Sequence, residues 1–151
     1  MKKYIIVSFM LAGILMMQNA TAQLSININI GNQPAWGPVG YNYVRYYYLP
    51  EINVYYDVDA KMFIYPSGRK WVTARYLPRN YGHIDLYKTY KVVINRNYPP
   101  YRDNRADIAK YSRYKNIRNQ VVIRDSRDRR YLESNNRTHE DRIIARNRAR
   151  R

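Results

Sequence analysis

The sequence predicts a mainly β protein: a small antiparallel meander or open barrel or sandwich, followed by a basic C-terminal tail that is partly helical or disordered. Three observations support this prediction. Short apolar and aromatic runs recur before residue 100, and glycine or proline separates them. Tyrosine, which favours sheets, is concentrated there, because 14 of the 18 tyrosines lie between Tyr41 and Tyr101. After Pro100 the chain becomes polar and rich in arginine.

The first 22 residues have the organisation of a cleavable secretory signal. Lys2 and Lys3 precede the apolar run 4–17, and a small-x-small sequence, Ala-Thr-Ala, ends at Ala22. The run is shorter than the roughly 20 residues that cross a bilayer, so a permanent anchor or a buried N-terminal element is the less favoured alternative. We therefore expect cleavage between Ala22 and Gln23, delivery to the periplasm or the medium, and no transmembrane segment in the mature chain.

Residues 23–100 are expected to form one tyrosine-rich β domain. Alternating apolar residues predict a strand over 24–30, and aromatic runs predict strands over 41–49 and 52–58. Further strands are expected over 61–65 and 69–74, and residues 84–87 with 90–94 are expected to form either another hairpin or one bent strand. Pro66-Ser67-Gly68 predicts a β-hairpin turn in which Gly68 supplies a positive φ.

The arginine-rich tail, residues 101–151, is expected to be partly helical or disordered. Asn104 and Asp107 have the spacing of a capping box, which predicts a helix that starts there. A short strand is expected over 120–124. Thr138 and Asp141 predict a second, short helix that would fray by itself, and we expect the end of the chain to become ordered on a partner.

The charge of the chain favours anionic partners. It carries 27 Lys and Arg against 11 Asp and Glu, a net charge of +16, and 16 of the basic residues follow Pro100. Most of these are arginines, whose planar fork binds phosphate or carboxylate in a bidentate fashion. We expect an anionic polymer or envelope surface as partner, such as lipid A phosphate or acidic polysaccharide; solubility alone is the simpler interpretation. Export argues against nucleic acid in vivo, and self-association through strand edges is an alternative.

The tyrosines allow two arrangements. Neighbouring residues of a strand point to opposite faces, so Arg45 and Tyr47 share one face. In one arrangement that face is exposed and stacks on sugars, bases or other rings. In the other the tyrosines form the core of the sheet. The candidate anion- and aromatic-binding residues are Arg45, Tyr47, Arg124, Arg127, Arg129 and Arg130.

The sequence shows no constellation typical of catalysis or metal binding. There is no cysteine, and the chain's two histidines are too few for a transition-metal site. Asp85 could orient His83, and Asp57 with Asp59 could serve a glycosidase or a calcium ion. The simpler interpretations are a loop histidine and a solvated strand end. We therefore expect a non-enzymatic protein without cofactor or metal, and a glycan-acting enzyme is the least favoured alternative.

Four stretches of the β domain carry a resemblance to a known family. A QPxWGPxGYxY stretch begins at Gln33, and a YYYLPxI stretch begins at Tyr46. A YPSGRKW-like hairpin covers Tyr65–Trp71, and a DLYxxYKVVI stretch covers Asp85–Ile94. Together they resemble a family of exported Bacteroidota proteins of unknown function. The resemblance covers about half the chain, residues 24–100, and implies export in a Gram-negative envelope and a β-rich fold, but no catalytic residues.

Overall fold

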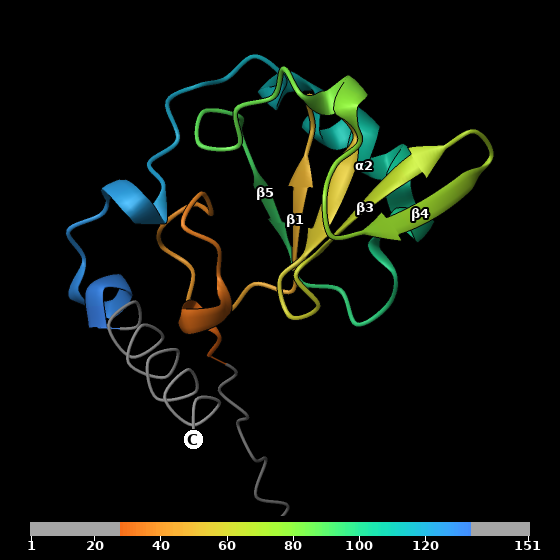
Figure 1. Cartoon of the computed structure of the whole chain (residues 1–151). Helices are drawn as coiled ribbons and strands as arrows, with labels where there is room; N and C mark the ends of the chain where they lie inside the picture. The colour runs from red at the N-terminus through yellow and green to blue at the C-terminus, as the bar shows by residue number, and fades with distance from the viewer. Residues whose placement is uncertain (1–27, 134–151) are drawn as a thin grey trace, which may run out of the picture.

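The computed structural model describes residues 28–133, and an antiparallel sheet of five strands forms its centre (Figure 1). The strands are β1 (Tyr46–Leu49), β2 (Val54–Asp57), β3 (Met62–Ser67), β4 (Lys70–Ala74) and β5 (Val92–Ile94). Their order is β4-β3-β2-β1-β5, so a four-stranded meander is extended by β5 beside β1. The sheet is open, with β4 and β5 at its two edges. The predicted mainly β fold is confirmed in the form of an open meander.

Short helical segments accompany the sheet. The 3-10 helices are η1 (Ile30–Asn32), η2 (Arg79–Tyr81), η3 (Pro100–Asp103), η4 (Ser112–Tyr114) and η5 (Ile123–Asp125). The α-helix α2 covers Asn104–Tyr111, and residues 129–133 are helical as well. The partly helical character of the C-terminal part is therefore confirmed. In the range 28–133, no helix is long and apolar enough to cross a membrane.

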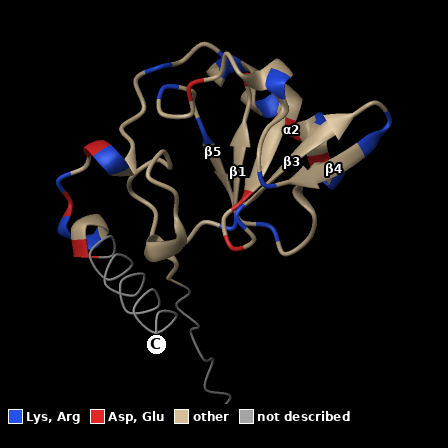
Figure 2. Ribbon diagram, viewed as in Figure 1, with Lys and Arg blue, Asp and Glu red and all other residues tan. Residues whose placement is uncertain are grey.

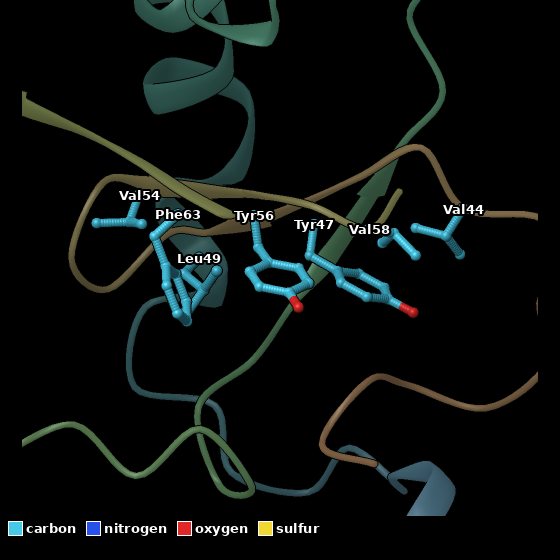
Figure 3. Close-up of a cluster of buried hydrophobic side chains, with 7 residues drawn as sticks. All are labelled: Val44, Tyr47, Leu49, Val54, Tyr56, Val58 and Phe63. Atoms are coloured by element: carbon cyan, nitrogen blue, oxygen red, sulfur yellow. The ribbon is translucent and has the colours of Figure 1, made fainter. Parts of the chain in front are cut away.

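One face of the sheet is buried under the N-terminal loop. Its core comprises Val44, Tyr47, Leu49, Val54, Tyr56, Val58 and Phe63, whose side chains point to the same side (Figure 3). The ring of Trp36 packs on this core, with centroids 5.6 Å from Tyr47 and 4.8 Å from Tyr56. The next residue, Gly37, has no side chain, and a Cβ at this position would lie only 2.6 Å from the Tyr47 hydroxyl oxygen. The WGP sequence thus fits closely over the sheet.

The opposite face is buried under the start of the tail. Its core comprises Tyr46, Tyr48, Tyr55, Ile64 and Ile94, and Tyr101 and Tyr111 pack against it. Tyr48 and Tyr55 are direct cross-strand partners, and their ring centroids lie 4.8 Å apart. Alternate tyrosines of one strand therefore enter two different cores, as the period of two requires. The arrangement in which the tyrosines form the core is the one observed.

The predicted hairpin at Ser67-Gly68 is confirmed. β3 and β4 pair from Phe63↔Ala74 to Ser67↔Lys70, which leaves Gly68 and Arg69 as the two-residue turn. Gly68 has φ +60°, whereas Arg69 is not among the residues with positive φ. Positive φ at the first turn position alone is the pattern of a type II′ turn, which suits the twist of the strands.

Two predicted strands are wrong where the structure describes them, because a side chain takes over the backbone hydrogen bonds. Residues 28–29 are irregular and Ile30 begins η1, since the Asn29 amide exchanges two bonds with the Val44 backbone, at 2.7 and 2.9 Å. Residues 24–27 lie outside the described range. Residues 84–87 form no strand and lead into a turn over 86–88, because the Asp85 carboxylate accepts the Tyr87 N–H at 2.9 Å. β1, β2, β4 and β5 are shorter than predicted, whereas β3 runs to Ser67, two residues beyond the predicted end.

The predicted strand over 120–124 is also wrong, since it is reduced to one bridge, Pro38↔Val122, followed by η5. The capping box predicted at Asn104 is wrong too. α2 begins at Asn104 with no side-chain cap, and the side chains of Asn104 and Asp107 instead turn to the sheet and bond to Tyr55, at 3.0 and 2.7 Å. The expected helix at Thr138 lies outside the described residues.

Candidate functional site

Ion pairing divides the surface into neutralised and bare regions. Within residues 28–133 each acidic side chain pairs with an Arg or Lys at N···O distances of 2.6–3.8 Å. These nine acids are Glu51, Asp57, Asp59, Asp85, Asp103, Asp107, Asp125, Asp128 and Glu133. In the same range twelve basic residues have no carboxylate partner: Lys61, Arg69, Lys70, Arg75, Arg79, Lys91, Arg102, Arg105, Lys110, Arg113, Lys115 and Arg127. We call these twelve residues the bare cations, because within residues 28–133 no carboxylate pairs with them. An anion-binding surface would be built from these residues.

Two of the predicted site residues, Arg45 and Tyr47, make contacts within the fold. Arg45 lies 2.8 Å from the Asp59 carboxylate and 3.7 Å from that of Asp57, so both aspartates pair with the same arginine. Tyr47 is fully buried, and its hydroxyl donates to Gln33 at 3.0 Å. Burial raises the pKa of Tyr47 well above its ordinary value. The prediction that Tyr47 offers its ring at the surface is therefore wrong, because Trp36 and Gly37 cover it.

Three of the four predicted tail arginines are paired locally. Arg124 donates to Asp125 at 2.9 Å, and its guanidinium carbon lies 3.8 Å from the centroid of the Tyr87 ring. Arg129 lies 3.5 Å from Glu133, and Arg130 lies 2.6 Å from Asp128. Arg127 alone of the four has no carboxylate partner within the described range.

Five of the bare cations lie on the helical segment that covers the sheet. Arg102, Arg105, Lys110, Arg113 and Lys115, which we call the basic helical surface, are all exposed. Figure 2 marks the Lys and Arg positions of the ribbon in blue, including those near α2. At 100° per residue, Arg102, Arg105 and Arg113 lie at least about 120° around the segment from Asp107, which is buried against the sheet, and Lys110 lies about 60° from it. The sheet therefore fixes which side of the segment faces outward, and that side carries positive charge.

A groove lies beside this surface, along the β5 edge of the sheet. It has a volume of about 470 Å³, within the range of about 300–1,000 Å³ that is typical of ligand sites. We call it the tyrosine groove; it is lined by Tyr41, Tyr90, Lys91, Val92, Val93, Asn95, Tyr111 and Tyr114. Its aromatic residues come from the N-terminal loop, the approach to β5 and the tail. The fold therefore brings together tyrosines that are distant in the sequence.

The rings of the tyrosine groove are ordered by stacking. Tyr90 and Tyr114 lie with centroids 4.6 Å apart and planes at 10°, and Tyr111 lies 6.4 Å from Tyr114. Burial, with Tyr114 and Tyr41 close by, raises the pKa of Tyr90, so its hydroxyl stays protonated at neutral pH. The groove presents flat rings with polar tips.

Lys91 is a buried base at the wall of the tyrosine groove. Its side chain is almost fully buried, and its ammonium group donates to the Leu86 carbonyl at 2.9 Å. Burial lowers the pKa of Lys91 to about 8. The backbone N–H and C=O of Lys91 both bond to the Gln120 side-chain amide at 2.9 Å, so this amide takes the place of a neighbouring strand.

The candidate catalytic groups are not assembled into a site. His83 is exposed in a turn, and no hydrogen bond joins it to Asp85, whose carboxylate accepts the Tyr87 N–H and forms an ion pair with Lys88 at 3.8 Å. Within residues 28–133 no three His, Asp or Glu side chains form a group that could hold a metal ion. The expected cleavage site, Ala22 and Gln23, lies outside the described residues.

The fold and the site define a small open-sheet protein whose helical cover bears a basic surface beside a tyrosine-lined groove. Comparison with family models, with curated proteins and with solved structures finds no match. The resemblance to exported Bacteroidota proteins therefore stays a prediction.

The sequence contained a signal for the basic helical surface that composition alone does not reveal. The spacing of Arg102, Arg105, Lys110 and Arg113 is i, i+3, i+8, i+11, which places four cations on one helical face. The tyrosine groove has no such local signal, because its walls come from three separate segments.

Proposed function

We propose that the protein is an exported, non-enzymatic binding protein that attaches to anionic polymers or surfaces of the cell envelope through the basic helical surface. One observation carries this proposal: every described acid takes part in an ion pair, while five exposed cations of one helical segment have no carboxylate partner within residues 28–133. Such cations keep their charge available for a ligand.

The physical basis is the release of counterions. Each ligand charge that a cation neutralises frees a condensed counterion, so affinity for a polyanion rises with the number of contacts and falls with salt. Lipid A phosphate and acidic polysaccharide are the envelope ligands of suitable charge. The secretory signal expected over residues 1–22 would bring the protein to them, in the periplasm or outside the cell.

The proposal is tested by neutralising the surface and comparing salt dependence. The triple variant Arg105→Gln, Lys110→Gln, Arg113→Gln replaces three bare cations by glutamine, an uncharged residue that favours helix. Binding of the full chain to a polyanion, such as inorganic polyphosphate, is measured from about 50 to 500 mM salt. The variant is expected to bind at least about tenfold more weakly, with a shallower salt slope.

The matched control removes the same charge from another place. Arg69→Gln, Lys70→Gln, Arg75→Gln removes three exposed, bare cations, two on the β3–β4 hairpin and one directly after β4. If this control loses as much affinity as the helical variant, net charge alone drives binding and the basic helical surface is not a site. Binding that is unchanged by salt would reject the electrostatic mechanism.

A second candidate function, assembly through strand edges, is favoured by the open sheet. β4 has one side without a partner strand, and such an edge can pair with another chain. A wild-type chain that stays monomeric at high concentration by light scattering would count against self-assembly.

A further inference from the structure

We propose that the tyrosine groove binds a sugar ring of an acidic polysaccharide. This inference rests on the proposed function and names the class of anionic polymer that the protein selects. The groove supplies the contacts that distinguish a saccharide from other polyanions, and the basic helical surface supplies the charge.

The rings of the groove provide flat apolar faces at its mouth. Tyr41 is 41% exposed, and Tyr90 and Tyr114 form a parallel pair with centroids 4.6 Å apart. Val92 and Val93 line the groove from β5 and add apolar surface. Tyrosine combines a flat apolar body with a polar tip, and the apolar side of a sugar ring packs against such a face.

The polar tips of these rings are available. In the described part of the chain, the hydroxyls of Tyr41, Tyr90 and Tyr111 take part in no hydrogen bond. They can each donate one bond and accept others. A saccharide, which carries several hydroxyls around a ring, satisfies these groups together.

Positive charge borders the groove. Arg113 donates to the Tyr114 hydroxyl at 3.0 Å, and its guanidinium carbon lies 4.9 Å from the centroid of that ring. The Lys110 ammonium lies 5.3 Å from the centroid of Tyr111. Both cations belong to the basic helical surface and have no carboxylate partner within residues 28–133. A sugar that bears an acidic group would contact rings and cations at the same time.

An extended peptide fits the groove less well. The Gln120 amide occupies both backbone groups of Lys91, which therefore point away from β1. By alternation Val93 is the next residue of β5 whose N–H and C=O face outward. A single residue with outward-facing N–H and C=O groups gives an added strand few backbone hydrogen bonds at the β5 edge. The stacking of a ligand on the tyrosine rings does not depend on the length of this edge.

The test compares a saccharide polyanion with one that has no rings. Binding of the full chain to oligogalacturonate and to inorganic polyphosphate is measured for wild type, Tyr41→Ala and Tyr90→Ala. The control is Tyr76→Ala, which removes a 77% exposed tyrosine that follows β4, at the opposite edge of the sheet. Thermal unfolding of each variant verifies the fold, and Tyr41→Ala removes no side-chain hydrogen bond of the described structure.

We expect each groove variant to lose at least about tenfold in affinity for oligogalacturonate and less than about twofold for polyphosphate, with no change in Tyr76→Ala. Wild type that binds polyphosphate but not oligogalacturonate, or groove variants that weaken both ligands equally or neither, would overturn the groove proposal and leave the proposed function standing. Wild type that binds neither would reject both. Displacement of oligogalacturonate from wild type by a peptide of residues 24–30, but not by free galacturonate, would assign the groove to strand pairing instead.

Discussion

The hydroxyl of Tyr55 in β2 donates a 2.7 Å hydrogen bond to the carboxylate of Asp107 in α2, and both residues are buried. Arg96, which follows β5, donates to the two oxygens of the same carboxylate at 2.6 and 2.7 Å. A buried charge is stable only when it is paired and hydrogen-bonded, so these contacts tie the position of α2 to the sheet. The outward direction of the basic helical surface follows from this buried pair.

Replacement of Asp107 by alanine is expected to destabilise the protein by about 3–5 kcal/mol, because it leaves the Arg96 guanidinium without its buried partner. The free energy of unfolding from urea titration measures this loss. Asp103→Ala is the control, since Asp103 contacts the same arginine at 3.3 Å but is 40% exposed at its side chain. It should cost no more than about 1 kcal/mol. Equal losses in the two variants would show that burial of Asp107 is not the cause.

The stability of the protein is expected to rise between pH 8 and pH 10. Burial lowers the pKa of Lys91 from its ordinary 10.5 to about 8, so in this window the unfolded chain binds a proton that the folded chain does not. Stability then increases with pH, by up to about 3 kcal/mol at about 1.36 kcal/mol per pKa unit. Urea midpoints at a series of pH values measure the slope. Lys91→Met keeps the aliphatic stem without the charge and should be flat in this range; a persistent slope would assign it to another group.

Above pH 10 the opposite trend is expected. Burial raises the pKa of Tyr48 to about 12 and those of Tyr47, Tyr55 and Tyr56 above their ordinary value of 10. The unfolded chain therefore loses these phenolic protons first, and stability falls as pH increases through and beyond 10. The ultraviolet absorbance of tyrosinate follows the titration: these rings should ionise together with unfolding. Full ionisation of all tyrosines while the fold persists would contradict the burial described here.

Local chemistry made part of the fold predictable. The β3–β4 hairpin follows from the Gly68 turn and the flanking β-formers, and period-two alternation correctly assigns neighbouring tyrosines to opposite faces. The burial of both faces of the sheet could not be deduced from the sequence, because the segments that cover the faces are distant from the strands in the sequence. Trp36 covers one and Tyr111 the other.

The errors share one physical origin. Asn29 and Asp85 use side chains to satisfy backbone groups that a strand would pair, and this competition leaves no trace in hydrophobic periodicity. Asp107 matched a capping box by spacing, yet burial against Tyr55 and Arg96 decides its direction. The basic helical surface was missed for the same reason: the number of arginines was visible, but their ion pairs were not.

The Gln120 side chain is expected to keep the β5 edge from pairing with other molecules. Its amide bonds to the N–H and C=O of Lys91 at 2.9 Å each, and Gln120→Ala would free both groups next to the outward-facing Val93. The variant should lose about 1–3 kcal/mol of unfolding free energy from two hydrogen bonds and should form more dimer than wild type at equal concentration. Sedimentation velocity measures the association, and Asn119→Ala, which removes an exposed neighbour without hydrogen bonds in the described structure, is the control.

Because the freed edge would admit a second strand beside the tyrosine groove, dimerisation of Gln120→Ala should also weaken oligogalacturonate binding as protein concentration rises. A variant that loses stability but remains as monomeric as Asn119→Ala would show that Gln120 supports the strand without guarding its edge.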